Sequence, residues 1–266
     1  MNYVHGYSSR ESDRLRDQSM ILETLLHKGT NYQKDEVVLE AGCGIGAQTI
    51  ILSKKSPQAK FTSVDISEQS LLQAEKSIRE QNILNVKFHR ENIMKMSFDD
   101  GAFDHIFICF VLEHLEKPEE ALLELKRVLK PKGSITIIEG DHGSCFWSPE
   151  TSDSLTVWHA LIKAQKELGH DPLIGRRLYP LLKQTAYIIK DVSPRYVYSD
   201  YINPKLLDGV VNSIIVPMVQ SSKDQIFNNS FLDKMSWEKG IKELSDVGRR
   251  SDGTFFYTWF KALAYK

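Results

Sequence analysis

The strongest constraint on the fold of this chain is the regular alternation of two kinds of segment between residues 37 and 139. Short runs rich in β-branched and aromatic residues alternate there with longer segments whose apolar residues recur every three or four positions. The short runs are residues 37–41, 60–65, 86–90, 103–109 and 134–139, and the helical segments are residues 47–55, 68–82 and 118–129. Strands that alternate with helices in this way form a parallel sheet with crossover helices on its faces. The pattern therefore predicts an α/β protein with a doubly wound sheet.

The regions on either side of this core are predicted to extend the sheet and to cover its ligand edge. Residues 9–28 have the apolar spacing of an amphipathic helix, which we expect to serve as an N-terminal lid. Residues 188–198 and 255–265 are predicted to be the last two strands. We expect residues 140–184 to form a cap insertion, or alternatively an interface between subunits. The whole chain, residues 1–266, is interpreted as a single domain with these two additions.

Composition excludes several classes of partner. The chain has 34 Lys and Arg against 35 Asp and Glu and no long basic run, so we expect no nucleic-acid partner. Its three cysteines, Cys43, Cys109 and Cys145, lack the CxxC spacing of a zinc site, so neither a metal centre nor a disulfide framework is expected. No apolar stretch approaches membrane-spanning length. These features predict a cytoplasmic protein without a membrane partner, either a monomer or a homodimer.

The clearest local motif is the sequence EAGCGIG at residues 40–46, between an apolar strand and a helix. Residues without side chains, such as Gly42 and Gly44, let the backbone turn tightly and approach a ligand. The N–H groups at the start of the following helix can bind an anionic group. The motif predicts a cofactor at the carboxyl edge of the sheet, with a plain strand-to-helix turn as the alternative.

Asp65 ends the next predicted strand, where an acid would meet the hydroxyls of a ribose. It could instead cap the following helix, but Ser67 is available for that role. Gly42, Gly44 and Ala47 also satisfy the GxGxx(G/A) pattern of dinucleotide-binding proteins. These residues alone therefore do not exclude the alternative of an enzyme that depends on NAD or a flavin.

Further motifs follow in order, and together they resemble the class I S-adenosylmethionine-dependent methyltransferases. Residues 38–46 look like motif I of that family, and residues 103–115 resemble its motif IV. Residues 91–93 look like the segment that borders the adenine, and residues 125–133 resemble the helix and turn before the fifth strand. One departure is Asn92, which stands where many relatives have Asp.

The resemblance implies a seven-stranded sheet of order 3-2-1-4-5-7-6 with the last strand antiparallel, helices on both faces, and S-adenosylmethionine as the cofactor. It also implies which side chains and backbone groups bind that cofactor. The methionine part of the cofactor would contact Gly42 and Gly44, and its ribose would bind to Asp65. The adenine would contact Asn92 and Ile93, and the site would be completed by Glu40, Phe110, Leu112 and Tyr7.

The expected reaction is methyl transfer to a small-molecule acceptor. The methyl group of the cofactor is already activated by its sulfonium, so the protein mainly has to align the acceptor and exclude water. If the acceptor carries a proton, Asp141 and His142, directly after the fifth strand, are the candidate bases. The alternatives are an NAD-dependent oxidoreductase and a catalytically silent S-adenosylmethionine-binding protein.

Overall fold

The computed structural model describes residues 9–266, which form two compact units. One, which we call the sheet unit, comprises residues 23–140, 173–195 and 259–266. The other, the helical unit, comprises residues 9–22, 141–172 and 196–258 of the described chain. The interpretation of the chain as one domain with a lid and a cap stays a prediction.

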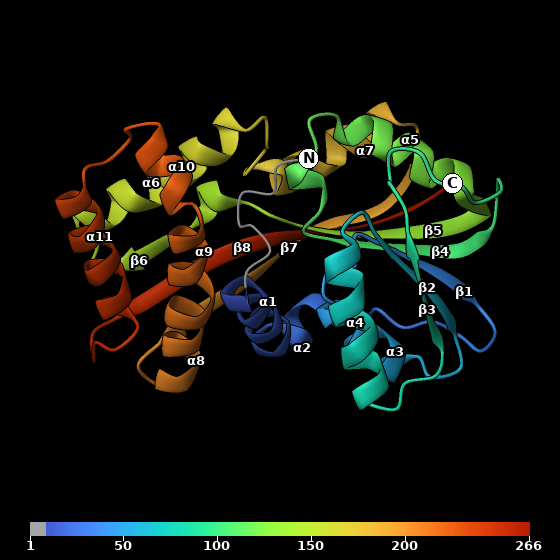
Figure 1. Cartoon of the computed structure of the whole chain (residues 1–266), viewed down its shortest axis with the longest axis horizontal. Coiled ribbons are helices and arrows are strands. Elements are labelled where there is room, and N and C mark those ends of the chain that lie inside the picture. The colour runs from blue at the N-terminus through green and yellow to red at the C-terminus, as the bar shows by residue number, and fades with distance from the viewer. Residues whose placement is uncertain (1–8) are drawn as a thin grey trace. The chain divides into compact units, whose positions relative to one another are not determined.

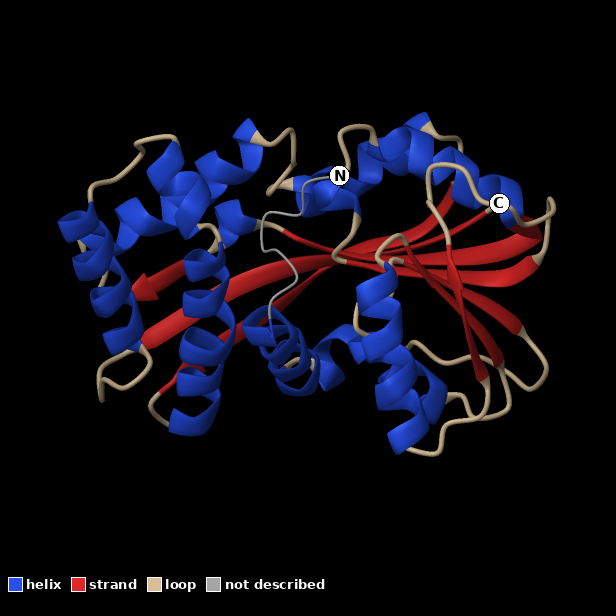
Figure 2. Ribbon diagram, in the orientation of Figure 1, coloured by secondary structure: helices blue, strands red, loops and turns tan. Residues whose placement is uncertain are grey.

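The sheet unit contains the predicted parallel sheet (Figures 1 and 2). Its strands lie in the order β3-β2-β1-β4-β5-β8, with β7 paired to β8, and β8 runs antiparallel to β5. This confirms the predicted order, because β7 and β8 are the sixth and seventh strands expected from the sequence. The strands are β1 (Val37–Ala41), β2 (Lys60–Asp65), β3 (Val86–Arg90), β4 (Phe103–Cys109), β5 (Leu129–Gly140), β7 (Ile188–Asp200) and β8 (Thr254–Tyr265).

Helices cover both faces of this sheet (Figure 1). In the view shown, α5 and α7 lie on one face and α3 and α4 on the other. The helices of the unit are α2 (Glu23–His27), α3 (Ala47–Lys55), α4 (Glu68–Glu80), α5 (Pro118–Val128) and α7 (Leu178–Gln184). The central strands are fully enclosed, as the strands of a parallel sheet with two covered faces should be, and Leu39, Ile106 and Ile137 are 0% exposed.

The strand register determines which residues meet at the ligand edge. Ala41 of β1 lies opposite Ile108 of β4, which in turn lies opposite Ile137 of β5. The carboxyl ends of these three neighbouring strands are therefore level with one another. Open α/β sheets bind ligands at this edge.

The helical unit contains a short antiparallel ladder beside its helices. Its elements are α1 (Ser9–Ile21), β6 (Phe146–Ser148), α6 (Ser152–Glu167), α8 (Pro204–Asp208), α9 (Val216–Ser221), α10 (Lys223–Asn228) and α11 (Lys234–Val247). Trp147 of β6 pairs with Phe255 in the first part of β8, and this strand pair was not predicted. A Cβ atom at Gly240 of α11 would overlap the Asp153 carbonyl and the Val157 side chain, so glycine lets α11 approach α6 closely.

Several elements differ from their predicted extents. The expected helix at residues 9–28 consists of two helices, α1 and α2, with Leu22 between them. A π-helix, Gly209–Ile215, which was not predicted, lies between α8 and α9. Strand β5 begins at Leu129 rather than residue 134, because Leu129 already pairs with Phe103. Within residues 9–266, no helix is long and apolar enough to cross a membrane.

Candidate active site

The loop between β1 and α3 is held against the neighbouring strand by backbone hydrogen bonds. The N–H groups of Gly42 and Cys43 both donate to the carbonyl of Val64, at 2.8 and 2.9 Å. Gly42 and Gly44 have φ angles of +75° and +52°, in the left-handed region that side chains disfavour. The predicted tight turn is therefore present at the carboxyl end of β1.

The two glycines face different surroundings. A Cβ atom at Gly42 would lie 2.5 Å from a methyl carbon of Val111, so this position must lack a side chain for the two loops to pack. A Cβ atom at Gly44 would meet no atom of the described residues, 9–266, within 4 Å. Gly44 thus turns an uncovered backbone surface outward at the ligand edge, which suits close approach of a ligand.

Asp65 lies at the end of β2, beside this loop. One of its carboxylate oxygens, Oδ2, accepts the N–H of Gly44 at 2.8 Å, and Oδ1 accepts the N–H of Ser67 at 2.8 Å. Burial raises the pKa of Asp65, and the backbone N–H groups oppose that shift. Ser67 itself caps α4 by accepting the N–H of Ser70 at 3.2 Å, as the sequence predicts. Asp65 therefore braces the glycine loop, and each oxygen keeps a lone pair for a further donor.

Glu40 lies below the loop, in the interior, and is buried. Its Oε2 atom accepts the hydroxyl groups of Thr49 at 2.6 Å and Ser63 at 2.7 Å. Burial raises the pKa of this carboxyl to about 7, although the two hydroxyl groups favour its ionised form. The structure places Glu40 behind the glycine loop rather than on its outer surface.

The segment predicted to border the adenine follows β3. The side-chain carbonyl of Asn92 accepts the N–H of Met94 at 3.0 Å, while Ile93 is buried. Asn92 itself is exposed, and its amide retains hydrogen-bonding capacity. The two residues thus combine one polar and one apolar surface close to the carboxyl end of β2.

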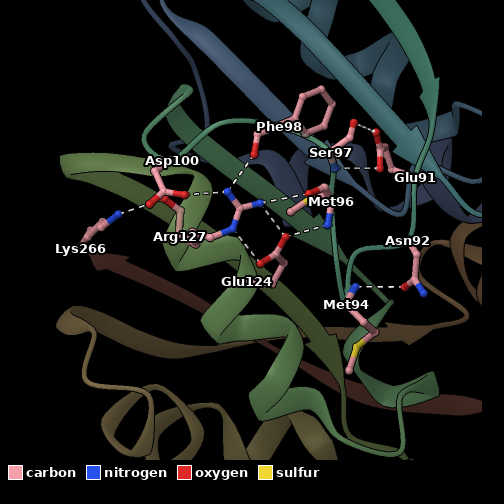
Figure 3. Close-up of polar contacts among 10 residues, drawn as sticks. All are labelled: Glu91, Asn92, Met94, Met96, Ser97, Phe98, Asp100, Glu124, Arg127 and Lys266. Atoms are coloured by element: carbon pink, nitrogen blue, oxygen red, sulfur yellow. Dashed lines mark hydrogen bonds and ion pairs between the residues drawn. The ribbon is translucent and has the colours of Figure 1, made fainter.

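An arginine of α5 fastens this segment (Figure 3). The Arg127 guanidinium donates to the carbonyls of Phe98 at 2.8 Å and Met96 at 3.1 Å, and pairs with Asp100 at 2.7 Å. Glu124 accepts from Arg127 at 2.8 and 2.9 Å and also accepts the N–H of Met96 at 2.6 Å. Sequence reasoning missed this clamp. Its only signal was an acid and an arginine three positions apart on a helix, which is common on solvated helix faces.

The loop after β4 completes the edge opposite the glycines. Phe110 has a φ of +57°, which is uncommon for a large side chain and often marks a functional position. Leu112 is 0% exposed, so it contributes to the core beneath the loop rather than to an open mouth. The N–H groups of Val111 and Leu112 both donate to a carboxylate oxygen of Glu139, at 3.0 and 2.7 Å.

The candidate bases belong to the helical unit. Asp141 accepts the N–H of Gly143 at 3.1 Å, and Nδ1 of His142 lies 2.6 Å from the hydroxyl of Tyr257. Burial, assisted by the positive charge of Arg14, lowers the pKa of His142 to about 3. His142 is therefore a neutral imidazole at physiological pH. Tyr7, the last predicted cofactor residue, lies outside the described residues.

These groups fit the cofactor that the motifs indicated. The uncovered backbone of Gly44 leaves room for an aliphatic chain, and Asp65 offers carboxylate oxygens of the kind that bind ribose hydroxyls. Asn92 and Ile93 supply a hydrogen-bonding group and an apolar surface for a base. All of them belong to the sheet unit.

Comparison with known proteins identifies what the chain is similar to. A family model described as a methyltransferase domain matches residues 32–186, more than half of the 266 residues. The chain is 26% identical over 239 residues to an uncharacterised methyltransferase of Schizosaccharomyces pombe, covering 85% of this chain and 83% of that protein. It is 32% identical over 113 residues to a demethylmenaquinone methyltransferase of Geobacillus, which covers 42% of this chain and only 48% of the relative.

A solved structure shows the same fold. A phosphoethanolamine N-methyltransferase of Haemonchus contortus, in complex with phosphomonomethylethanolamine and S-adenosylhomocysteine, superposes with a TM-score of 0.59 and 14% identity. The superposition covers 100% of this chain and 61% of that protein. At this identity the likeness concerns the architecture alone.

Proposed function

Since the chain belongs to the class I S-adenosylmethionine-dependent methyltransferases, we propose that it methylates a small molecule and holds its cofactor on the carboxyl edge of the sheet unit. The cofactor of the family is S-adenosylmethionine, so the reaction is methyl transfer rather than hydride transfer. The observation that carries the proposed site is the uncovered, left-handed backbone of Gly44 beside the Asp65 carboxylate.

Each proposed binding residue has a distinct task. The backbone of Gly42 and Gly44 accommodates the methionine portion, because among the described residues no side chain covers Gly44. Asp65 accepts the ribose hydroxyls, and Asn92 and Ile93 flank the adenine. Glu40 supports the glycine loop from within, while Phe110 and Leu112 shape the loop after β4, and Tyr7 is proposed near the sulfonium.

A small-molecule acceptor is supported by the relatives and by charge. The Geobacillus relative is a demethylmenaquinone methyltransferase, and the Haemonchus structure contains phosphomonomethylethanolamine. The net charge of −1 lacks the positive excess with which proteins bind nucleic acids. We therefore propose an acceptor of low molecular weight.

The bound cofactor supplies a methyl group made electrophilic by its positive sulfur. The chain then has to fix the position of this group, and the Asp65 and Val64 hydrogen bonds hold the loop in one conformation for that purpose. Asp141 and His142 remain the proposed bases for an acceptor that carries a proton. Because burial lowers the pKa of His142 to about 3, this imidazole would be a weak base.

Calorimetry with S-adenosylhomocysteine and with NADH tests the cofactor, and we expect binding of the first ligand only. Tritium transfer from labelled S-adenosylmethionine to a panel of small molecules then tests for turnover. Binding of NADH without S-adenosylhomocysteine would favour the oxidoreductase alternative. Binding of S-adenosylhomocysteine without transfer to any acceptor would favour the catalytically silent alternative.

A further inference from the structure

Glu139 of β5 lies near the glycine loop, although three strands, β2, β3 and β4, separate β5 from β1 along the chain. It follows Ile138, which pairs with Cys109 of β4, and Ile108 of β4 pairs with Ala41 of β1. Glu139 is therefore level with the glycine loop, one strand away from β1. Because neighbouring strands are about 4.8 Å apart, the backbone of β5 lies about 10 Å from that of β1. This distance is within reach of a side chain and a small ligand.

A chain of direct contacts joins Glu139 to the loop. Its Oε1 atom accepts the N–H groups of Val111 at 3.0 Å and Leu112 at 2.7 Å. The side chain of Val111 lies directly on Gly42, where a Cβ atom would come within 2.5 Å of it. Only one residue thus separates the carboxyl group of Glu139 from the backbone that is proposed to hold the cofactor.

The second carboxyl oxygen of Glu139 has no hydrogen-bond partner among residues 9–266, and the residue is 0% exposed. A buried carboxylate with an unpaired oxygen is costly, so the neutral acid is favoured while no cation is near. The neighbouring carboxyl of Glu113 also favours the neutral form of Glu139. Burial and the carboxyl of Glu113 raise the pKa of Glu139 well above its ordinary value.

The other titratable groups around this position are Cys109 on β4, Glu40 on β1 and Lys261 on β8. Burial raises the pKa of the Cys109 thiol well above its ordinary value; the charges of Glu139, Glu40 and Glu113 add to this shift and that of Lys261 opposes it. Burial in turn lowers the pKa of Lys261 to about 8, and its ammonium donates to the carbonyls of residues 26 and 28. Lys261 is thus engaged elsewhere, and no cation of residues 9–266 pairs with Glu139.

We propose that the protonation state of Glu139 follows the charge of the bound ligand. Its carboxyl group is neutral in the protein alone and with S-adenosylhomocysteine, and it ionises when S-adenosylmethionine binds. This rests on the cofactor site proposed above. Binding of the positive sulfonium expels the carboxyl proton to solvent and leaves a carboxylate near the positive sulfur. Methyl transfer converts the sulfonium to a neutral thioether, and Glu139 then takes up one proton. The exchange favours the charged cofactor over the neutral product.

The test is calorimetric titration of the protein with each ligand at pH 7.5 in two buffers of different ionisation enthalpy, which gives the number of protons released. The sulfonium lowers the pKa of the α-amino group of S-adenosylmethionine below that of S-adenosylhomocysteine, so this contribution is subtracted by comparison with the Glu139→Gln variant, in which it is the same. We expect S-adenosylmethionine to release about one proton more than S-adenosylhomocysteine, as linkage requires for one group that ionises on binding. Equal proton release with the two ligands would overturn the proposal while leaving the cofactor site intact.

Two matched variants assign the proton. Glu139→Gln keeps a carbonyl for the N–H groups of Val111 and Leu112 but cannot ionise. We expect it to bind S-adenosylhomocysteine within about twofold of the wild type, to lose the excess proton release, and to bind S-adenosylmethionine about tenfold less tightly. Glu40→Gln removes another buried acid, on β1, and keeps an acceptor oxygen for the hydroxyl groups of Thr49 and Ser63, so it should retain the excess release. If the excess disappears in Glu40→Gln and survives in Glu139→Gln, the proposal is wrong. If the wild type binds neither ligand, the cofactor site itself fails, and the proposal with it.

Discussion

Replacing Gly44 by alanine is expected to remove most cofactor binding at a small cost in folding. Gly44 has a φ of +52°, and within the described part of the chain a Cβ atom there would meet nothing within 4 Å. The added methyl group therefore clashes with none of these residues and occupies the space proposed for the ligand. Alanine is preferable to valine here, because a β-branched residue at positive φ would add strain of its own.

The chain offers a matched control in Gly29, at the end of α2. Gly29 has a φ of +76°, and a Cβ atom there would also meet none of residues 9–266 within 4 Å. Left-handed backbone costs an alanine about 1–2 kcal/mol, so both variants should lose the same stability. For a domain of this size that is about 2–8 °C in Tm. The two variants thus differ only in whether the methyl group faces the proposed ligand.

Calorimetry with S-adenosylhomocysteine separates the two effects. Gly44→Ala should raise the Kd at least about tenfold, which is about 1.4 kcal/mol. Gly29→Ala should leave the Kd unchanged. Wild-type affinity in Gly44→Ala, at a Tm equal to that of Gly29→Ala, would refute the reasoning, because the uncovered face of Gly44 would then not contact the cofactor.

Three further predictions concern residues around the site. Asp65→Ala should weaken S-adenosylhomocysteine binding by about 2 kcal/mol or more. The control Ser67→Ala removes only the cap of α4, so it should lower the stability by about 1 kcal/mol and leave the affinity unchanged. Equal affinities in the two variants would show that Asp65 does not bind the ligand. Arg127→Met should increase deuterium exchange in the segment after β3, and it should weaken the binding of S-adenosylhomocysteine more than that of homocysteine. Unchanged exchange would show that the Arg127 hydrogen bonds do not hold this segment in place. Burial lowers the pKa of His27 to about 4, so between pH 6.5 and 4 the unfolded chain binds more protons than the folded chain. The free energy of unfolding should therefore decrease as the pH is lowered through that window, by up to about 3 kcal/mol. His27→Phe should flatten this acid-side slope in urea titrations, and an unchanged slope would assign the protons to other groups.

The strands of the sheet were predictable because each is a short apolar run bounded by polar turns. Residues 37–41, 60–65, 86–90 and 103–109 are strands with the bounds expected from the sequence. The amino end of β5 was harder to predict, because the local sequence Lys130-Pro131-Lys132-Gly133 is typical of a turn. Pairing of Leu129 with Phe103 nevertheless makes it part of the strand, and only a tertiary contact specifies this.

The helical unit was harder to anticipate, because its amphipathic periodicity does not specify what each helix packs against. The spacing of α1 suggested an apolar buried face, yet Glu11, Arg14 and Gln18 are buried. Arg14 donates to both carboxylate oxygens of Glu11 and to Gln18 at 2.6 Å, so the polar groups satisfy one another in the interior. Such pairing cannot be distinguished by sequence from the i,i+3 and i,i+4 pairs of a solvated helix.

Within the site, the sequence indicated which residues stand at the ligand edge but not how they support one another. The positions of Gly42, Gly44 and Asp65 follow from motif spacing. The hydrogen bonds from Gly44 to Asp65 and from the loop after β4 to Glu139 join segments more than twenty residues apart. No local pattern specifies such bonds, so they became visible only with the fold.

The most direct test of this account is the crystal structure of the protein with S-adenosylhomocysteine. The account predicts the methionine portion along the backbone of Gly42 and Gly44, the ribose hydroxyls within hydrogen-bond distance of the Asp65 carboxylate, and the adenine between Asn92 and Ile93. A ligand bound elsewhere, or a ribose that does not reach Asp65, would contradict it.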